Sequence, residues 1–132
     1  MPSAESACDA QIKKLSAAAL ELEQYLAFHP ELSGEERNSS ARITAFCRKE
    51  GMTVEYPFAG LPYAFRAAAV RVPDPTGKLC ILCEYDALPI GHGCGHCAHG
   101  TMSVLAACAL RRISELCQMD VDLIGTPDEE LR

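Results

Sequence analysis

The chain has 132 residues and a formal net charge of −6, so a nucleic-acid partner, whose phosphates attract basic surfaces, is not expected. Hydrophobic residues make up 48% of the sequence and charged residues 23%, which predicts one globular domain with a sizeable core. No apolar run approaches the roughly 20 residues of a membrane span, and the first ten residues lack the order of a signal peptide, so we expect a soluble cytoplasmic protein without a membrane partner.

Two helices are predicted in the amino-terminal third of the chain. Residues 7–28 place apolar side chains at helical spacing. Pro30 ends this helix because proline disfavours helical geometry in the residue before it. A second helix is expected over residues 35–50, and Gly51 stops it.

Four strands and a third helix are predicted in the remainder. The strands are expected over residues 52–56, 64–72, 79–85 and 119–125, and the helix over residues 98–116. Residues 73–77 read PDPTG, a turn sequence, so strands 64–72 and 79–85 are expected to pair antiparallel. The continuous apolar run at residues 79–83 is typical of a buried strand. The whole chain is therefore predicted to form one α/β unit.

A glycine-rich segment carries the strongest chemical signal. Residues 84–100 read EYDALPIGHGCGHCAHG and hold three of the four histidines and two of the eight cysteines. Cys94 and His96 are separated only by Gly95, so a thiolate and an imidazole can converge on one cation. The segment joins the end of a predicted strand to the start of a helix, where α/β sheets place their chemistry. A metal site is therefore predicted here.

A second chemical signal follows the last predicted strand, where residues 125–130 read GTPDEE. Adjacent carboxylates such as Glu129 and Glu130 can divide labour, one binding a metal and the other accepting a proton from water. An acidic run alone is usually a solvated turn. A right-handed crossover between the third and fourth strands would bring both signals to one edge of the sheet.

Two readings without catalysis stay open at this point. The spacing of Cys80, Cys83, Cys94 and Cys97 invites a structural zinc-binding module. An extended strand points Cys80 and Cys83 to opposite faces, which disfavours their chelating one ion. The other alternative is a non-catalytic fragment that pairs with another chain.

The segments EYDALP, GHGCGH and GTPDEE, preceded by HPELSGEE, resemble the amidohydrolase branch of the aminoacylase and carboxypeptidase-type metallopeptidases, peptidase family M20. This branch includes indole-acetyl-amino-acid hydrolases and aminoacylase-like dipeptidases. The resemblance implies a three-layer α/β catalytic domain with a mixed central sheet. Residues 1–132 would be its amino-terminal part, without the lid and dimerisation domain or the carboxyl-terminal part, so a homodimer is expected only together with the lid.

The resemblance also implies roles for individual residues. Three residues would bind metal: Cys94, His96 and Glu130. Glu129 would be the general base, and Asp86 would orient a ligand. His99 matches a histidine that commonly follows the ligand histidine by three residues. Cys97 departs from the family, which usually has Asp or Asn at this position.

The implied activity is metal-dependent hydrolysis of an amide bond in an N-acyl amino acid or a small dipeptide-like substrate. One or two divalent ions are expected in the complete enzyme. The soft thiolate of Cys94 favours zinc, whereas the carboxylate of Glu130 suits manganese. This fragment alone is expected to be inactive, because further histidine ligands of the family would lie outside it.

Overall fold

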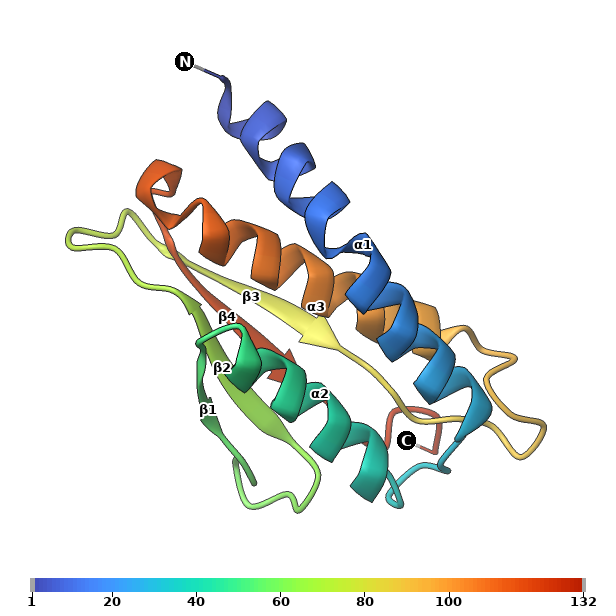
Figure 1. Cartoon of the computed structure of the whole chain (residues 1–132). Helices are drawn as coiled ribbons and strands as arrows, with labels where there is room; N and C mark the ends of the chain where they lie inside the picture. Colours follow the sequence, from blue (N-terminus) through green and yellow to red (C-terminus); the bar gives the residue numbers. More distant parts are fainter. Residues whose placement is uncertain (1, 132) are drawn as a thin grey trace.

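The computed structural model describes residues 2–131, so positions 1 and 132 of the expected unit lie outside the described residues. The described chain forms three long helices and a four-stranded mixed sheet (Figure 1), which confirms the expected α/β class. The elements are α1 (Ala4–Phe28), α2 (Arg37–Lys49), β1 (Thr53–Glu55), β2 (Phe65–Val70), β3 (Lys78–Cys83), α3 (His96–Arg112), the short 3₁₀ helix η1 (Ser114–Leu116) and β4 (Asp120–Gly125).

The strands lie in the order β1-β2-β4-β3. β4 runs parallel to β3, from the pair Lys78 and Asp120 to the pair Cys83 and Gly125, and antiparallel to β2. The predicted antiparallel pairing of residues 64–72 with 79–85 is therefore wrong. β4 is almost wholly buried, and such a strand takes a central position in a sheet, between two neighbours.

The three helices cover one face of the sheet. α3 packs on β2, β3 and β4, while α1 lies along α3 and α2 lies beside β1 and β2 (Figure 1). Alternate residues of the strands face these helices. One core cluster therefore joins side chains of all three helices to Phe65, Ala67, Val121 and Leu123 of the sheet.

The opposite face of the sheet is only partly covered within the described residues. Leu82 of β3 is 52% exposed and Leu79 is 44% exposed, so the prediction that residues 79–83 form a buried strand is wrong for this part of the chain. The reason is topological, because β3 lies at the edge of the sheet and only Cys83 at its end is enclosed.

The parallel pairing of β3 and β4 brings their carboxyl ends together. The backbone N–H of Thr126 donates to the carbonyl oxygen of Cys83 at 2.9 Å, which extends the contact beyond the strands. α3 begins at His96, two residues earlier than predicted. Gly95 precedes it with a φ of 87°, a left-handed conformation that favours glycine. The two predicted chemical signals therefore share one edge of the sheet.

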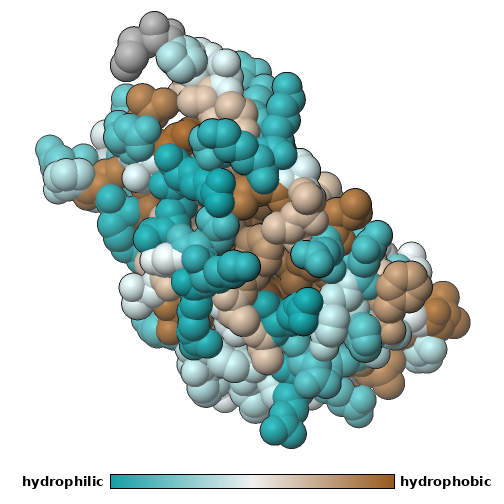
Figure 2. Space-filling view, viewed as in Figure 1, coloured by the Kyte–Doolittle hydropathy of each residue, from teal (hydrophilic) through white to brown (hydrophobic). Residues whose placement is uncertain are grey.

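The surface is hydrophilic over much of the face seen in Figure 2, with apolar patches between the helices and at the end where the loop between β3 and α3 projects. Ile90 in this loop is 84% exposed. No helix among the described residues is long and apolar enough to cross a membrane.

Candidate metal centre

The imidazole of His96 is held by Asp86, the residue expected to orient a ligand. Nδ1 of His96 lies 2.8 Å from Oδ1 of Asp86 and 3.0 Å from its backbone oxygen. Because both neighbours are acceptors, Nδ1 must carry the hydrogen. Nε2 is then the atom that a metal ion would use.

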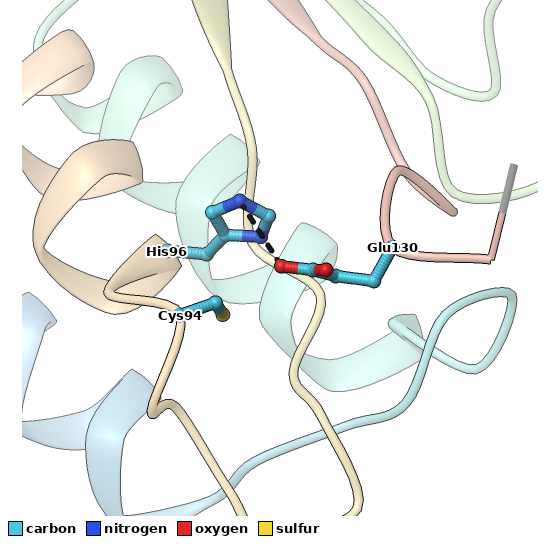
Figure 3. A group of neighbouring side chains, drawn as sticks. All are labelled: Cys94, His96 and Glu130. Carbon is cyan, nitrogen blue, oxygen red and sulfur yellow. Dashed lines mark ion pairs between the residues drawn. The ribbon is translucent and has the colours of Figure 1, made fainter.

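Three side chains expected to bind metal converge on this edge of the sheet. The donor atoms of Cys94, His96 and Glu130 all lie within 4.8 Å of one another. Figure 3 shows Cys94 and His96 approaching from the start of α3 and Glu130 from the loop after β4. Oε1 of Glu130 is 3.7 Å from Nε2 of His96. Residues far apart in the sequence therefore form one compact donor set.

Glu129 approaches the same imidazole, with Oε2 at 3.7 Å from Nε2 of His96. Glu84, which was not among the predicted site residues, also contacts this imidazole, with its Oε2 at 2.9 Å from Nε2. Glu84, His96 and Glu129 form a second group with donor atoms within 4.8 Å of one another. Strand alternation could have indicated Glu84, because it lies two residues before Asp86 on the same side of an extended chain.

Asp86 is fully buried but well partnered. Its Oδ2 accepts hydrogen bonds from the Ser33 hydroxyl at 2.7 Å and from the Glu130 backbone N–H at 2.8 Å. Burial opposes ionisation of this carboxyl, yet these two donors and the imidazole of His96 lower its pKa. Asp86 therefore stays a carboxylate and joins the HPELSGEE segment, His96 and the acidic loop.

The surroundings raise the pKa of both ligand candidates on the α3 side, for different reasons. Burial disfavours the imidazolium of His96, but hydrogen bonds to Asp86 and the charge of Glu84 raise its pKa above the ordinary value. Burial also raises the pKa of the Cys94 thiol, whose Sγ donates to the Asp86 backbone oxygen at 3.7 Å. A metal ion would therefore have to displace a proton from each group.

The loop at residues 126–130 turns both glutamates toward His96. Asp128 has a φ of 64°, a left-handed conformation that breaks the extended alternation expected after β4. Glu129 keeps half of its side chain exposed, whereas Glu130 is 23% exposed. The turn gives the adjacent acids different access to solvent.

His99 lies on the first turn of α3, at the margin of the centre. Its Nδ1 accepts the Glu84 backbone N–H at 3.4 Å and lies 4.0 Å from Oε2 of Glu84. It belongs to neither donor group found among the described residues. Its polar contacts are therefore with Glu84, and its ring lies 6.1 Å from that of His96, measured between centroids.

The four thiols of the alternative zinc module do not converge. Cys80 is exposed on β3, whereas Cys83 is buried and its Sγ donates to the Gly100 backbone oxygen. Cys97 contacts Oε1 of Glu23 at 3.6 Å. Within the described chain, neither donor group includes more than one cysteine, which argues against a structural four-cysteine site.

The donor set fits a divalent cation. Four carboxylates lie at this edge: Glu84, Asp86, Glu129 and Glu130. Among the described residues their ion-pair partners are His96 and His99 alone. A cation would offset this concentration of negative charge, and sulfur, nitrogen and oxygen donors together suit zinc or a similar ion.

Comparisons with known proteins agree with this description. Residues 72–132 match peptidase family M20/M25/M40. The Xaa-Arg dipeptidase of Mus musculus is 37% identical over 113 residues, covering 76% of this chain and 26% of that protein. Thermostable carboxypeptidase 1 of Saccharolobus solfataricus is 31% identical over 117 residues, covering 77% of this chain and 29% of that protein.

A solved structure shares the fold. The Bacillus subtilis protein described as a dinuclear metal-binding peptidase of the M20 family superimposes with a TM-score of 0.83 at 22% identity, covering 90% of this chain and 37% of that one. The chain spans 26% to 29% of the length of the two curated relatives above.

Proposed function

Because the chain belongs to peptidase family M20/M25/M40 through residues 72–132, we propose that it is part of a metal-dependent amidohydrolase. This enzyme would cleave N-acyl amino acids or small dipeptides. The observation that carries this proposal is the convergence of Cys94, His96 and Glu130 within 4.8 Å. The relatives are named as a dipeptidase and a carboxypeptidase, and both of these act on amide bonds.

Cys94, His96 and Glu130 would hold the divalent ion, with Asp86 fixing the imidazole from behind. The ion would supply Lewis-acid chemistry, which activates water and polarises the amide carbonyl. The thiolate of Cys94 favours zinc and the carboxylate of Glu130 admits manganese. One or two ions are compatible with this proposal, since Glu84 and Glu129 add further oxygen donors around His96.

Glu129 is proposed as the general base. Its side chain is half exposed and approaches Nε2 of His96 to 3.7 Å, so it can reach both solvent and the ligand cluster. The carboxylate would take a proton from the attacking water and return it to the leaving nitrogen. Glu130 would keep its oxygens on the ion, so the adjacent acids would have separate roles.

We also propose a substrate preference and a place for this chain in a larger protein. The mouse relative is named for dipeptides that end in arginine, and a cationic residue would suit a chain with a net charge of −6. We further propose that residues 1–132 are the amino-terminal part of a catalytic domain. Further metal ligands and a lid that also mediates dimerisation would then come from other parts of the protein.

Chelation and metal return test this function in a protein with the complete catalytic domain. Hydrolysis of N-acyl amino acids and of dipeptides would be measured before chelation, after it, and after zinc or manganese is added back. We expect loss and then recovery of amide cleavage. Full activity in the chelated, metal-depleted protein would contradict the proposal.

A further inference from the structure

A second buried carboxyl, Glu36, reaches the loop that carries the two catalytic-site glutamates. Glu36 lies immediately before α2 and is fully buried. Its Oε1 accepts the backbone N–H of Asp128 at 2.7 Å, across 92 positions of sequence. Figure 1 shows the start of α2 beside the carboxyl-terminal loop. We propose that Glu36 is a positioning residue that fixes this loop and thereby places Glu130 at the metal centre.

The loop is held at two points by carboxyls from two other parts of the chain. Glu36 receives the N–H of Asp128, and Asp86 receives the N–H of Glu130 at 2.8 Å. Glu129 lies between these two attachments. The backbone is therefore fixed by hydrogen bonds on both sides of Glu129, the proposed base, while the side chain of Glu129 stays half exposed.

The conformation of Asp128 explains why an anchor is needed. Its φ of 64° is left-handed, a region that is unfavourable for a residue with a side chain. Aspartate tolerates the region better than most residues, but the following two glutamates must still be turned toward His96. A hydrogen bond from the Asp128 N–H to a buried acceptor opposes relaxation of the turn.

Burying the carboxyl of Glu36 costs free energy of folding. Burial raises its pKa, and its Oε2 has no hydrogen-bond partner among the described residues. Filling the same space with an apolar side chain would avoid the desolvation of a carboxyl. An acid at this position provides an acceptor for the backbone N–H groups around it, and the one that belongs to the acidic loop is that of Asp128.

This inference rests on the proposed role of Glu130 as a metal ligand, and a metal titration tests both separately. The readout is the Co²⁺ affinity of the chain, measured by competition with a chelator. Glu36→Met removes the acceptor while keeping similar volume, and Glu36→Gln keeps an acceptor oxygen. We expect roughly a 10-fold loss of affinity in Glu36→Met, in the range typical of groups that orient metal ligands, and less than about threefold in Glu36→Gln.

Glu31→Met is the matched control. The carboxylate of Glu31 accepts the backbone N–H groups of Asn38 and Ser39 at 3.0 and 2.6 Å, so its loss weakens the start of the same helix without touching the acidic loop. We expect near-parental Co²⁺ affinity in this variant. An equal loss of affinity in Glu31→Met and Glu36→Met would assign the effect to α2 and overturn the positioning role.

A double-mutant cycle with Glu130→Gln completes the test. If Glu36 acts through Glu130, Glu36→Met should cause no further loss of Co²⁺ affinity once Glu130 is replaced. A full 10-fold loss in that background would overturn the inference, as would a 10-fold loss in Glu36→Gln. Unchanged affinity in Glu130→Gln alone would instead show that the proposed metal ligand set is wrong.

Discussion

His96 Nδ1 and Asp86 Oδ1 lie 2.8 Å apart, and the contact is buried. The carboxylate fixes the imidazole tautomer and aims Nε2 at the three glutamates. Because Asp86 also receives the backbone N–H of Glu130, one carboxylate positions ligand candidates on both sides of the centre.

Asp86→Asn should weaken metal binding by about 10- to 100-fold. The asparagine side chain has an N–H₂ group in place of one carboxylate oxygen, and this group would face a hydrogen-bond donor instead of accepting from it. Competition with a chelator measures this change. Ser33→Ala is the control, because it removes one donor to Asp86 and leaves the imidazole contact. A larger loss in Ser33→Ala than in Asp86→Asn would contradict the orienting role.

Cys94→Ser should also lower metal affinity strongly, because a serine hydroxyl is not ionised near neutral pH as a coordinated thiol is. With Co²⁺, the thiolate charge-transfer absorption should disappear. Cys97→Ser is the control, since Cys97 contacts Glu23 rather than the donor set, and at most a modest loss is expected. Unchanged metal content in Cys94→Ser would rule out Cys94 as a ligand.

The roles of the adjacent acids can be separated in a protein with the complete catalytic domain. Glu129→Gln should keep the metal and lose most of kcat, because an amide preserves shape but cannot take the proton. Glu130→Gln should instead lose metal affinity. Metal loss in Glu129→Gln together with retention in Glu130→Gln would reverse the assignment.

Gly100→Ala should destabilise the chain although alanine normally favours a helix by about 1 kcal/mol over glycine. A Cβ atom at this position would lie 2.5 Å from the backbone oxygen of Glu84, so α3 would have to move away from the end of β3. We expect a net loss of about 1–3 kcal/mol in the free energy of unfolding. Urea denaturation measures it.

Met102→Ala, two residues further along α3 at a position that is 62% exposed, is the control and should stay within about 0.5 kcal/mol of the parent. Equal stability of the Gly100→Ala variant and the parent would show that the close approach of α3 to Glu84 can relax without cost.

The stability of the chain should respond to pH through Glu36. Burial raises the pKa of this carboxyl above its ordinary value of 4.5, so the folded chain holds the proton to higher pH than the unfolded chain does. Its favourable contribution is complete below the unfolded pKa and is lost as the pH rises through the folded pKa.

The Glu36→Gln variant stays neutral throughout this range. Its free energy of unfolding, measured by urea denaturation at several pH values, should therefore rise relative to that of the parent as the pH increases above 4.5. A difference in stability that stays constant with pH would show that Glu36 is ionised alike in both states.

Local patterns were sufficient to predict the helices and the segments that carry the site. The spacing of apolar residues indicated α1, and the order strand, Cys94-Gly95-His96, helix placed the centre at the end of β3. The position of β4 between β2 and β3 could not be predicted from the PDPTG turn, because that turn specifies a reversal and leaves the strand partners open. Pairing depends on the burial of whole strands.

The contacts that organise the candidate centre were harder to predict than the residues that could bind a metal there. Glu84, Ser33 and Glu36 act through hydrogen bonds or ion pairs with residues distant in the chain. Asp86 was expected to support a ligand only from family resemblance. A single sequence shows which side chains can donate or accept, whereas the partner of each follows from the packing of the loops.

The central place of β4 also determines when the sheet can close during synthesis. β2 and β3 share no hydrogen-bonded edge of their own, since each pairs with β4. Until residues 120–125 leave the ribosome, both earlier strands therefore present open edges, which are templates for aggregation. The nascent chain consequently depends on β4 to cover these two edges, and the candidate metal centre can assemble only after that strand is in place.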